Sequence, residues 1–108
     1  MPSFADNLAR LPDVSQIQRL ELYRADAGSV AIIENKPGSA GSVAVYLHLM
    51  RKHGVITVLA AREGLELYAE HTADAHAHPG KHPNIDQLIQ VIADGIGLSV
   101  EPIRRPPQ

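Results

Sequence analysis

Apolar and polar residues alternate in the first third of the chain, which is the pattern of β-strands with one buried face. In residues 17–24, Leu20 and Leu22 alternate with charged or polar neighbours. Residues 29–35 predict a second strand, and because apolar residues occupy both of its faces we expect it to be the more central of the two. Residues 25–28 between them contain aspartate and glycine, which favour a tight turn and hence a β-hairpin.

Helical spacing dominates the remainder of the chain. The predicted helices cover residues 3–11, 42–53, 57–77 and 85–94. A short strand at residues 98–101 follows, and Pro102 indicates that this strand lies at a sheet edge. A hairpin, a run of helices and a late strand predict an α+β fold with a small three-stranded, mostly antiparallel sheet covered on one face by three to four helices. We expect residues 1–103 to form a single domain and residues 104–108 to be a frayed tail.

The predicted helix at residues 57–77 has two distinct faces. Its acidic face carries Glu63, Glu66, Glu70 and Asp74. Leu59 and Leu67 lie near this acidic face rather than the apolar one, an arrangement that we expect at a protein–protein contact and that predicts a homo-oligomer. Gly64 costs roughly 1 kcal/mol relative to alanine inside a helix, unless close packing needs the space.

Composition excludes several classes of protein. The 108 residues include 44% hydrophobic residues, enough for a buried core, and no cysteine, so disulfides, thiolate ligands and cysteine nucleophiles are excluded. Ten Lys and Arg against twelve Asp and Glu give a net charge of −2, and aromatic residues are few, so we expect no nucleic-acid partner. The longest aliphatic run is too short to span a bilayer, and the first residues lack the pattern of a signal peptide. A cytoplasmic protein without a membrane partner is therefore expected.

Four of the six histidines fall within twelve residues near the end of the predicted long helix. Imidazole and carboxylate groups are common metal ligands, so a divalent ion such as zinc, nickel or iron is one hypothesis. Its ligands would be His71, Asp74, His78 and His82. His78 precedes a proline and is expected to leave helical geometry, so the loop would have to fold back to bring these groups together. The alternative interpretation is that the histidines interact with the dipole at the helix C-terminus.

The segment of residues 36–42 joins the predicted hairpin to the next helix. Its glycines would let an anion approach the backbone N–H groups of a helix N-terminus, and its lysine and serines could add charge and hydroxyl donors. The candidate ligand-binding residues are Lys36, Gly38, Ser39, Gly41 and Ser42. The segment lacks the P-loop and dinucleotide-binding patterns, so ordinary turn and helix-capping chemistry is the alternative interpretation.

Two segments of the sequence show a resemblance to a known family. Residues 33–42 followed by Val45 and Tyr46, and the stretch from residue 60 to residue 86, resemble the signatures of a small bacterial family catalogued only as a domain of unknown function. The resemblance extends over about residues 4–100. It implies a stand-alone bacterial cytoplasmic protein, and it implies no activity.

These observations leave two classes of function. The favoured hypothesis is a non-enzymatic binding or interaction protein, because neither candidate site has ligand spacing tight enough to stand alone. The alternatives are a metal-dependent protein or small enzyme that uses the histidine cluster, and a protein that binds an anion at the Gly-Ser segment. The sequence does not decide whether the protein is an enzyme.

Overall fold

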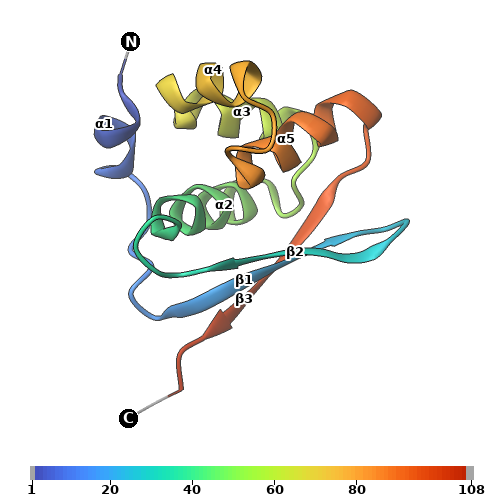
Figure 1. Cartoon of the computed structure of the whole chain (residues 1–108). Coiled ribbons are helices and arrows are strands. Elements are labelled where there is room, and N and C mark those ends of the chain that lie inside the picture. The colour runs from blue at the N-terminus through green and yellow to red at the C-terminus, as the bar shows by residue number, and fades with distance from the viewer. Residues whose placement is uncertain (1, 107–108) are drawn as a thin grey trace.

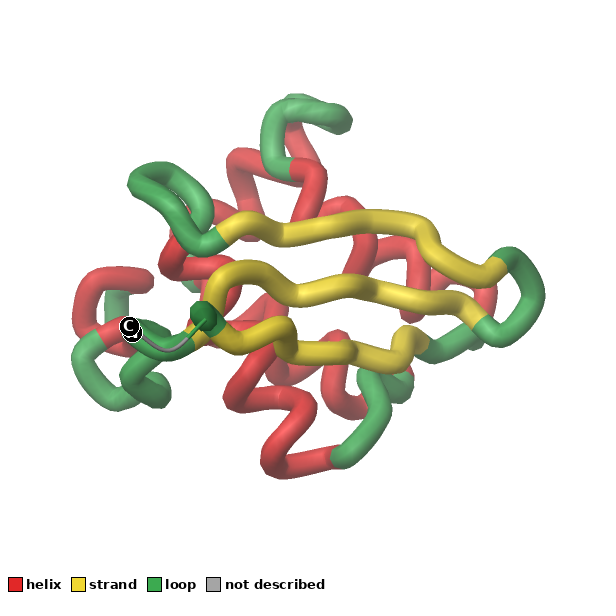
Figure 2. The backbone as a smooth tube through the Cα atoms, turned by 90° about the horizontal axis from the view of Figure 1, so that it is seen from below, coloured by secondary structure: helices red, strands yellow, loops and turns green. Residues whose placement is uncertain are grey.

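The computed structural model describes residues 2–106, which fold into a three-stranded antiparallel sheet and five helices. The strands are β1 (Ile17–Arg24), β2 (Gly28–Glu34) and β3 (Leu98–Arg104), in the order β2-β1-β3 (Figure 2). The predicted α+β class, the hairpin and the edge position of the last strand are confirmed. The expectation that the second strand is the more central one is wrong, because β3 pairs with β1 and leaves β2 at an edge, where Ile32 is 56% exposed.

The helices pack on one face of the sheet and leave the other face open (Figures 1 and 2). They are α1 (Phe4–Leu8), α2 (Ala40–His53), α3 (Val58–Tyr68), α4 (Glu70–Ala77) and α5 (Pro83–Asp94). Ser3 begins α1 with a reciprocal capping box, in which its hydroxyl accepts from the N–H of Asp6 while the Asp6 carboxylate accepts from the N–H of Ser3. The capping box therefore stabilises the first turn of α1. None of the helices in the described part of the chain is long and apolar enough to cross a membrane.

The core lies between the sheet and α2, α3 and α5. Leu20 and Leu22 of β1 are fully buried on the helix-covered face, and α2 is buried over most of its surface, as its all-round apolar sequence predicts. Gly64 of α3 lies where a Cβ atom would come within 2.6 Å of Leu88 Cδ1 and 2.9 Å of Leu49 Cδ1. Close packing of α3 against α2 and α5 therefore explains the glycine that the helix would otherwise disfavour.

The structure divides the predicted helix at residues 57–77 into α3 and α4. Ala69 lies between them with φ 53° and ψ −117°, a backbone conformation that glycine adopts easily and alanine does not. The two helices remain joined across the break, because the hydroxyl of Thr72 donates to the carbonyl of Leu65 at 2.6 Å. The break occurs although residues 65–77 contain no glycine or proline.

Two further boundaries differ from expectation. The last helix begins at Pro83, with His82 and not Asn84 at its N-cap position, because proline is well suited to the first turn. The last strand continues to Arg104, and Arg105 donates hydrogen bonds to the carbonyls of Gln16 and Ser15. The tail predicted at residues 104–108 is therefore tied to the molecule at its start, and its last two residues lie outside the described part of the chain.

Candidate functional site

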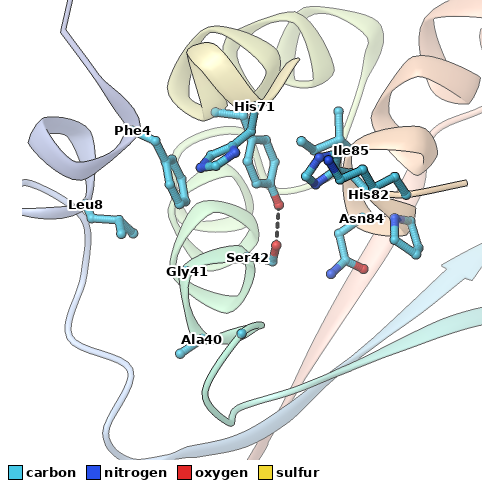
Figure 3. A pocket seen from close by; sticks show the side chains of 13 residues that line it. Phe4, Leu8, Ala40, Gly41, Ser42, His71, His82, Asn84 and Ile85 are labelled. Carbon is cyan, nitrogen blue, oxygen red and sulfur yellow. Dashed lines mark hydrogen bonds between the residues drawn. The ribbon is translucent and has the colours of Figure 1, made fainter. Parts of the chain in front are cut away.

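A pocket of about 380 Å³ lies where the start of α2, the junction of α3 and α4, and the start of α5 meet, with α1 along one side (Figure 3). The pocket is lined by Gly38 and residues 40–42 and, from a distant part of the sequence, by residues 81–85. The two segments that the sequence analysis treated as separate candidate sites therefore meet at one cavity.

The start of α2 forms the floor of the pocket with Gly38, Gly41 and Ser42. A Cβ atom on Gly41 would come within 3.0 Å of the ring of Phe4, so the glycine lets α1 approach α2 closely. Within residues 2–106, the N–H groups of Gly41 and Ser42 donate no hydrogen bond, as is usual in the first turn of a helix. These two groups are therefore free to bind an acceptor in the pocket.

A buried tyrosine orients the serine of this floor. The hydroxyl of Tyr68 donates to Ser42 Oγ at 2.6 Å, and burial raises the pKa of Tyr68 well above its usual value, so the phenol keeps its proton. Because the Ser42 oxygen accepts this bond, its own hydroxyl hydrogen remains available to donate. The Ser42 hydroxyl is therefore an uncharged hydrogen-bond donor that Tyr68 holds in place at the floor of the pocket.

The facing wall carries nitrogen side chains from α4 and from the loop that precedes α5. His71 and His82 have ring centroids 5.8 Å apart, and both line the pocket together with Lys81. Behind them, Asp74 accepts from His82 Nε2 at 2.6 Å and from Lys81 Nζ at 2.9 Å. The hydrogen bonds from His82 and Lys81 lower the pKa of Asp74 to about 2, so its carboxylate is ionised at neutral pH. An ionised carboxylate only accepts, which places a proton on His82 Nε2.

The start of α5 completes the polar part of the pocket. Asn84 lines it, and its backbone carbonyl accepts from the hydroxyl of the fully buried Tyr46 at 2.6 Å. Burial raises the pKa of Tyr46 well above its ordinary value. Since the backbone N–H of Asn84 donates no hydrogen bond within the described chain, a second helix N-terminus offers a free donor to the same cavity.

Apolar side chains close the remaining side. Phe4 and Leu8 come from α1 and Ile85 from α5. The ring of Phe4 packs edge-on against His71 with a centroid distance of 5.1 Å and stacks on Tyr68 at 5.4 Å. The pocket therefore has a polar end and an apolar side.

The predicted anion-binding segment is only partly assembled at this pocket. Gly38, Gly41 and Ser42 line it, whereas Lys36 and Ser39 do not. The ammonium group of Lys36 pairs with Glu34 at 3.3 Å, and the Ser39 hydroxyl donates to the Glu34 carbonyl. These two residues hold the turn between β2 and α2 instead of facing a ligand.

The predicted metal ligands are only partly brought together. His82 contacts Asp74, and His71 lies beside His82, but His78 Nε2 is 3.9 Å from Asp74 Oδ1 and its side chain is mostly exposed. Among residues 2–106, no group of three or more His, Cys, Asp or Glu side chains is arranged to hold a metal ion. Lys81 and His82 both bind Asp74 Oδ2, and His78 lies outside this contact.

A second histidine cluster escaped the sequence analysis. Glu63 of α3 accepts from His48 Nε2 at 2.8 Å, from His53 Nε2 at 2.9 Å and from Lys52 Nζ at 3.0 Å. Burial of the Glu63 carboxyl raises its pKa, but the bonds from His53, Lys52 and His48 outweigh burial and lower the pKa to about 2. Part of this cluster was detectable in the sequence, because Lys52 follows His48 at the i+4 spacing of one helix face.

The predicted interface residues differ in exposure. Leu59 is 69% exposed, whereas Leu67 is half-buried and packs against the core. The carbonyl of Leu67 accepts from the side-chain amide of Asn7 at 2.9 Å, so α1 covers this end of α3. Leu59 is the freer of the two apolar side chains.

Comparison with known proteins identifies a family. No curated protein and no solved structure matches the chain. Residues 4–102 match a family described as "uncharacterized protein conserved in bacteria" (DUF2322), which extends from the start of α1 nearly to the end of β3. The resemblance seen in the sequence is thereby confirmed, and the chain belongs to this bacterial family of uncharacterised proteins.

Proposed function

We propose that this protein binds a small anionic ligand in the pocket between α2, α4 and α5. The observation that carries the proposal is the convergence of two polar segments, at the start of α2 and at the start of α5, on one cavity of about 380 Å³. That volume lies within the range of small-molecule sites.

The charges around the pocket favour an anion. Lys81, His71 and His82 line it, and none of the described residues that line it carries a carboxylate. The nearest acidic group, Asp74, contacts His82 and Lys81 from behind. The described lining of the pocket therefore offers nitrogen side chains and no carboxylate to a ligand.

The hydrogen-bond donors are of the kind that anions use. The free N–H groups of Gly41, Ser42 and Asn84 belong to two helix N-termini, where the helix dipole favours negative charge. The hydroxyl of Ser42 adds a donor that is held in place by Tyr68. Because no nucleophile in the pocket is paired with a base, binding without catalysis is the function that these residues support best.

The direct test is a titration of inorganic phosphate followed by NMR. We expect the backbone amides of Gly41, Ser42 and Asn84 and the rings of His71 and His82 to shift together along one saturating curve in the millimolar range or below. Unchanged pocket signals, or shifts that occur equally at surface sites remote from the pocket, would overturn the proposal.

Two lysines provide a matched pair of variants. Lys81 and Lys52 each bind a carboxylate, at 2.9 and 3.0 Å, and their side chains are 58% and 57% exposed. Lys81→Gln is expected to weaken phosphate binding about tenfold, whereas Lys52→Gln should leave it unchanged. Equal effects of the two substitutions would show that phosphate responds to net charge and not to the pocket.

The serine and its tyrosine can be separated by a double substitution. Ser42→Ala removes a donor from the pocket and leaves the Tyr68 hydroxyl buried without a partner, which costs about 1–3 kcal/mol of stability. Adding Tyr68→Phe removes that unsatisfied group and should restore most of the stability without restoring phosphate binding. Recovery of binding in the double variant would exclude the Ser42 hydroxyl as a ligand contact.

A further inference from the structure

Resting on the proposed function, we infer that the ligand is a phosphate monoester with a compact apolar organic group, and that the protein prefers it over both inorganic phosphate and a carboxylate. The polar end of the pocket would hold the phosphoryl group, and the side formed by Phe4, Leu8 and Ile85 would hold the organic group.

The number and placement of donors favour phosphate over carboxylate. His71 and His82 approach the polar end from the wall opposite Ser42 (Figure 3), and Lys81 also lines the cavity. A carboxylate presents two oxygens in one plane, whereas a phosphate monoester presents three oxygens that point in different directions. Donors on facing walls can therefore all be satisfied by the tetrahedral group but not by the planar one.

The apolar side favours an ester over the free anion. The five heavy atoms of inorganic phosphate would fill only a part of a cavity of about 380 Å³, and its oxygens would have no hydrogen-bond partner along Phe4 and Leu8. Both side chains are only half-buried, so a ligand that covers them removes apolar surface from water. An organic group on the fourth phosphate oxygen would occupy this space.

The charge arrangement also suits a group that carries between one and two negative charges at neutral pH. Lys81 supplies one positive charge, which Asp74 offsets at 2.9 Å when the ligand is absent. The two imidazoles, whose rings lie 5.8 Å apart, line the same cavity and add nitrogen atoms that can form hydrogen bonds. Glu70 is the other acidic group near His71, and its carboxylate accepts from the backbone N–H of Phe4 at 2.8 Å, which keeps it engaged with α1.

The experiment compares four probes by calorimetry and NMR: phenyl phosphate, inorganic phosphate, benzoate and phenol. We expect phenyl phosphate to bind at least about tenfold more tightly than inorganic phosphate or benzoate, and phenol to bind more weakly than either. If phosphate and benzoate bind at the pocket and phenyl phosphate is no better than phosphate, the inference fails while the proposed function stands. If none of the four shifts the pocket signals, both fail.

A variant of the apolar side separates the two ends of the pocket. Leu8→Ser is expected to weaken phenyl phosphate binding several-fold and to leave inorganic phosphate binding unchanged. Leu59→Ser, which alters an exposed leucine outside the pocket, is the matched control and should change neither. If Leu8→Ser weakened the binding of phenyl phosphate and of inorganic phosphate equally, the organic group would not lie beside α1. The same conclusion would follow if Leu8→Ser weakened the binding of neither.

Discussion

Two clusters in this molecule have nearly the same composition and differ in what lies next to them. Asp74 binds Lys81 and His82, and Glu63 binds Lys52 together with His48 and His53. In both clusters the hydrogen bonds to the carboxyl lower its pKa to about 2. The cluster around Asp74 adjoins a cavity that His82 and Lys81 line and that has no carboxylate among its described lining residues. The cluster around Glu63 joins α2 to α3 and borders a larger, open hollow of about 1200 Å³ that Glu63, Glu66 and Glu70 line.

The difference shows that composition alone does not identify a site. Glu63 satisfies three donors at once, and its partners are used in holding two helices together. Asp74 accepts hydrogen bonds from His82 and Lys81. These two side chains also line a cavity that has no carboxylate among its described lining residues. We therefore propose a structural role for the cluster around Glu63 and a ligand-binding role for the cluster around Asp74.

The largest expected effect comes from the packing that supports the whole helical layer. Gly64→Val would push side-chain atoms into Leu88 and Leu49 and should destabilise the fold by about 1–3 kcal/mol, measured by urea unfolding. Glu66→Val, at an exposed position of the same helix, is the control and should change stability by less than about 0.5 kcal/mol. Equal stability of the two variants would contradict the close packing at Gly64.

The next effect separates the two clusters directly. Glu63→Gln removes the charged acceptor of three side chains and is expected to lower the free energy of unfolding by about 1–3 kcal/mol while phosphate affinity stays unchanged. The counterpart Asp74→Asn is expected to alter phosphate affinity and to change stability less, because Asp74 is the more exposed carboxylate. The proposed roles would be wrong if Glu63→Gln weakened phosphate binding and Asp74→Asn mainly lowered stability.

Acid unfolding tests the same contrast through pH. The pKa of Glu63 falls from 4.5 to about 2 on folding, so its contribution to stability is complete above pH 4.5 and is lost as the pH drops towards 2. We expect the melting temperature to fall over this interval and to fall less steeply in Glu63→Gln. Parallel pH profiles for Glu63→Gln and the parent protein would show that the three hydrogen bonds to Glu63 are not formed in solution.

Metal addition tests the other hypothesis for the histidine cluster. Because Asp74 is bound to Lys81 and His82, and His78 Nε2 lies 3.9 Å from the nearer Asp74 oxygen, we expect at most a small thermal shift with zinc, nickel or iron. Elemental analysis of protein purified without an affinity tag should give metal well below one equivalent. One bound equivalent that is lost in His82→Gln but kept in His53→Gln would instead place a metal beside the pocket.

The smallest effect on stability is expected at the predicted interface. Leu59→Glu changes a largely exposed side chain and should alter the free energy of unfolding by less than about 0.5 kcal/mol. If the protein forms an oligomer through this face, the variant elutes later than the parent protein on size-exclusion chromatography. Identical elution volumes would exclude Leu59 from an interface, and Leu67 is the poorer probe because it also packs against the core.

Local pattern predicted the elements of the fold well and their long-range arrangement less well. The hairpin, the apolar helix that ends at His53 and the edge strand with Pro102 follow from signals within a few residues. The central position of β1 depends on pairing with β3, about eighty residues later, which no local pattern contains. The break at Ala69 was not predicted, since alanine favours helices and residues 65–77 contain no glycine or proline.

The site was predicted in its parts but not as a whole. Gly38, Gly41 and Ser42 were identified from the glycine-rich turn before a helix, and His71 and His82 from the density of histidines. Their meeting at one cavity results from the packing of α2 against α3 and α5, which the sequence does not show. Phe4 and Leu8 of α1 line the apolar side of the pocket, and the sequence predicted only that they lie on a helix.

The unusual backbone of Ala69 has a consequence for redesign of this protein. A designer who optimised the segment for helix formation would try to continue α3 through residue 69, which would remove an unfavourable φ of 53°. His71, however, lies beyond this residue and beside Phe4, in a position that an uninterrupted helix would not reproduce. The more regular protein would therefore lose the side chain that stands between the aromatic ring of α1 and the imidazole of the loop before α5.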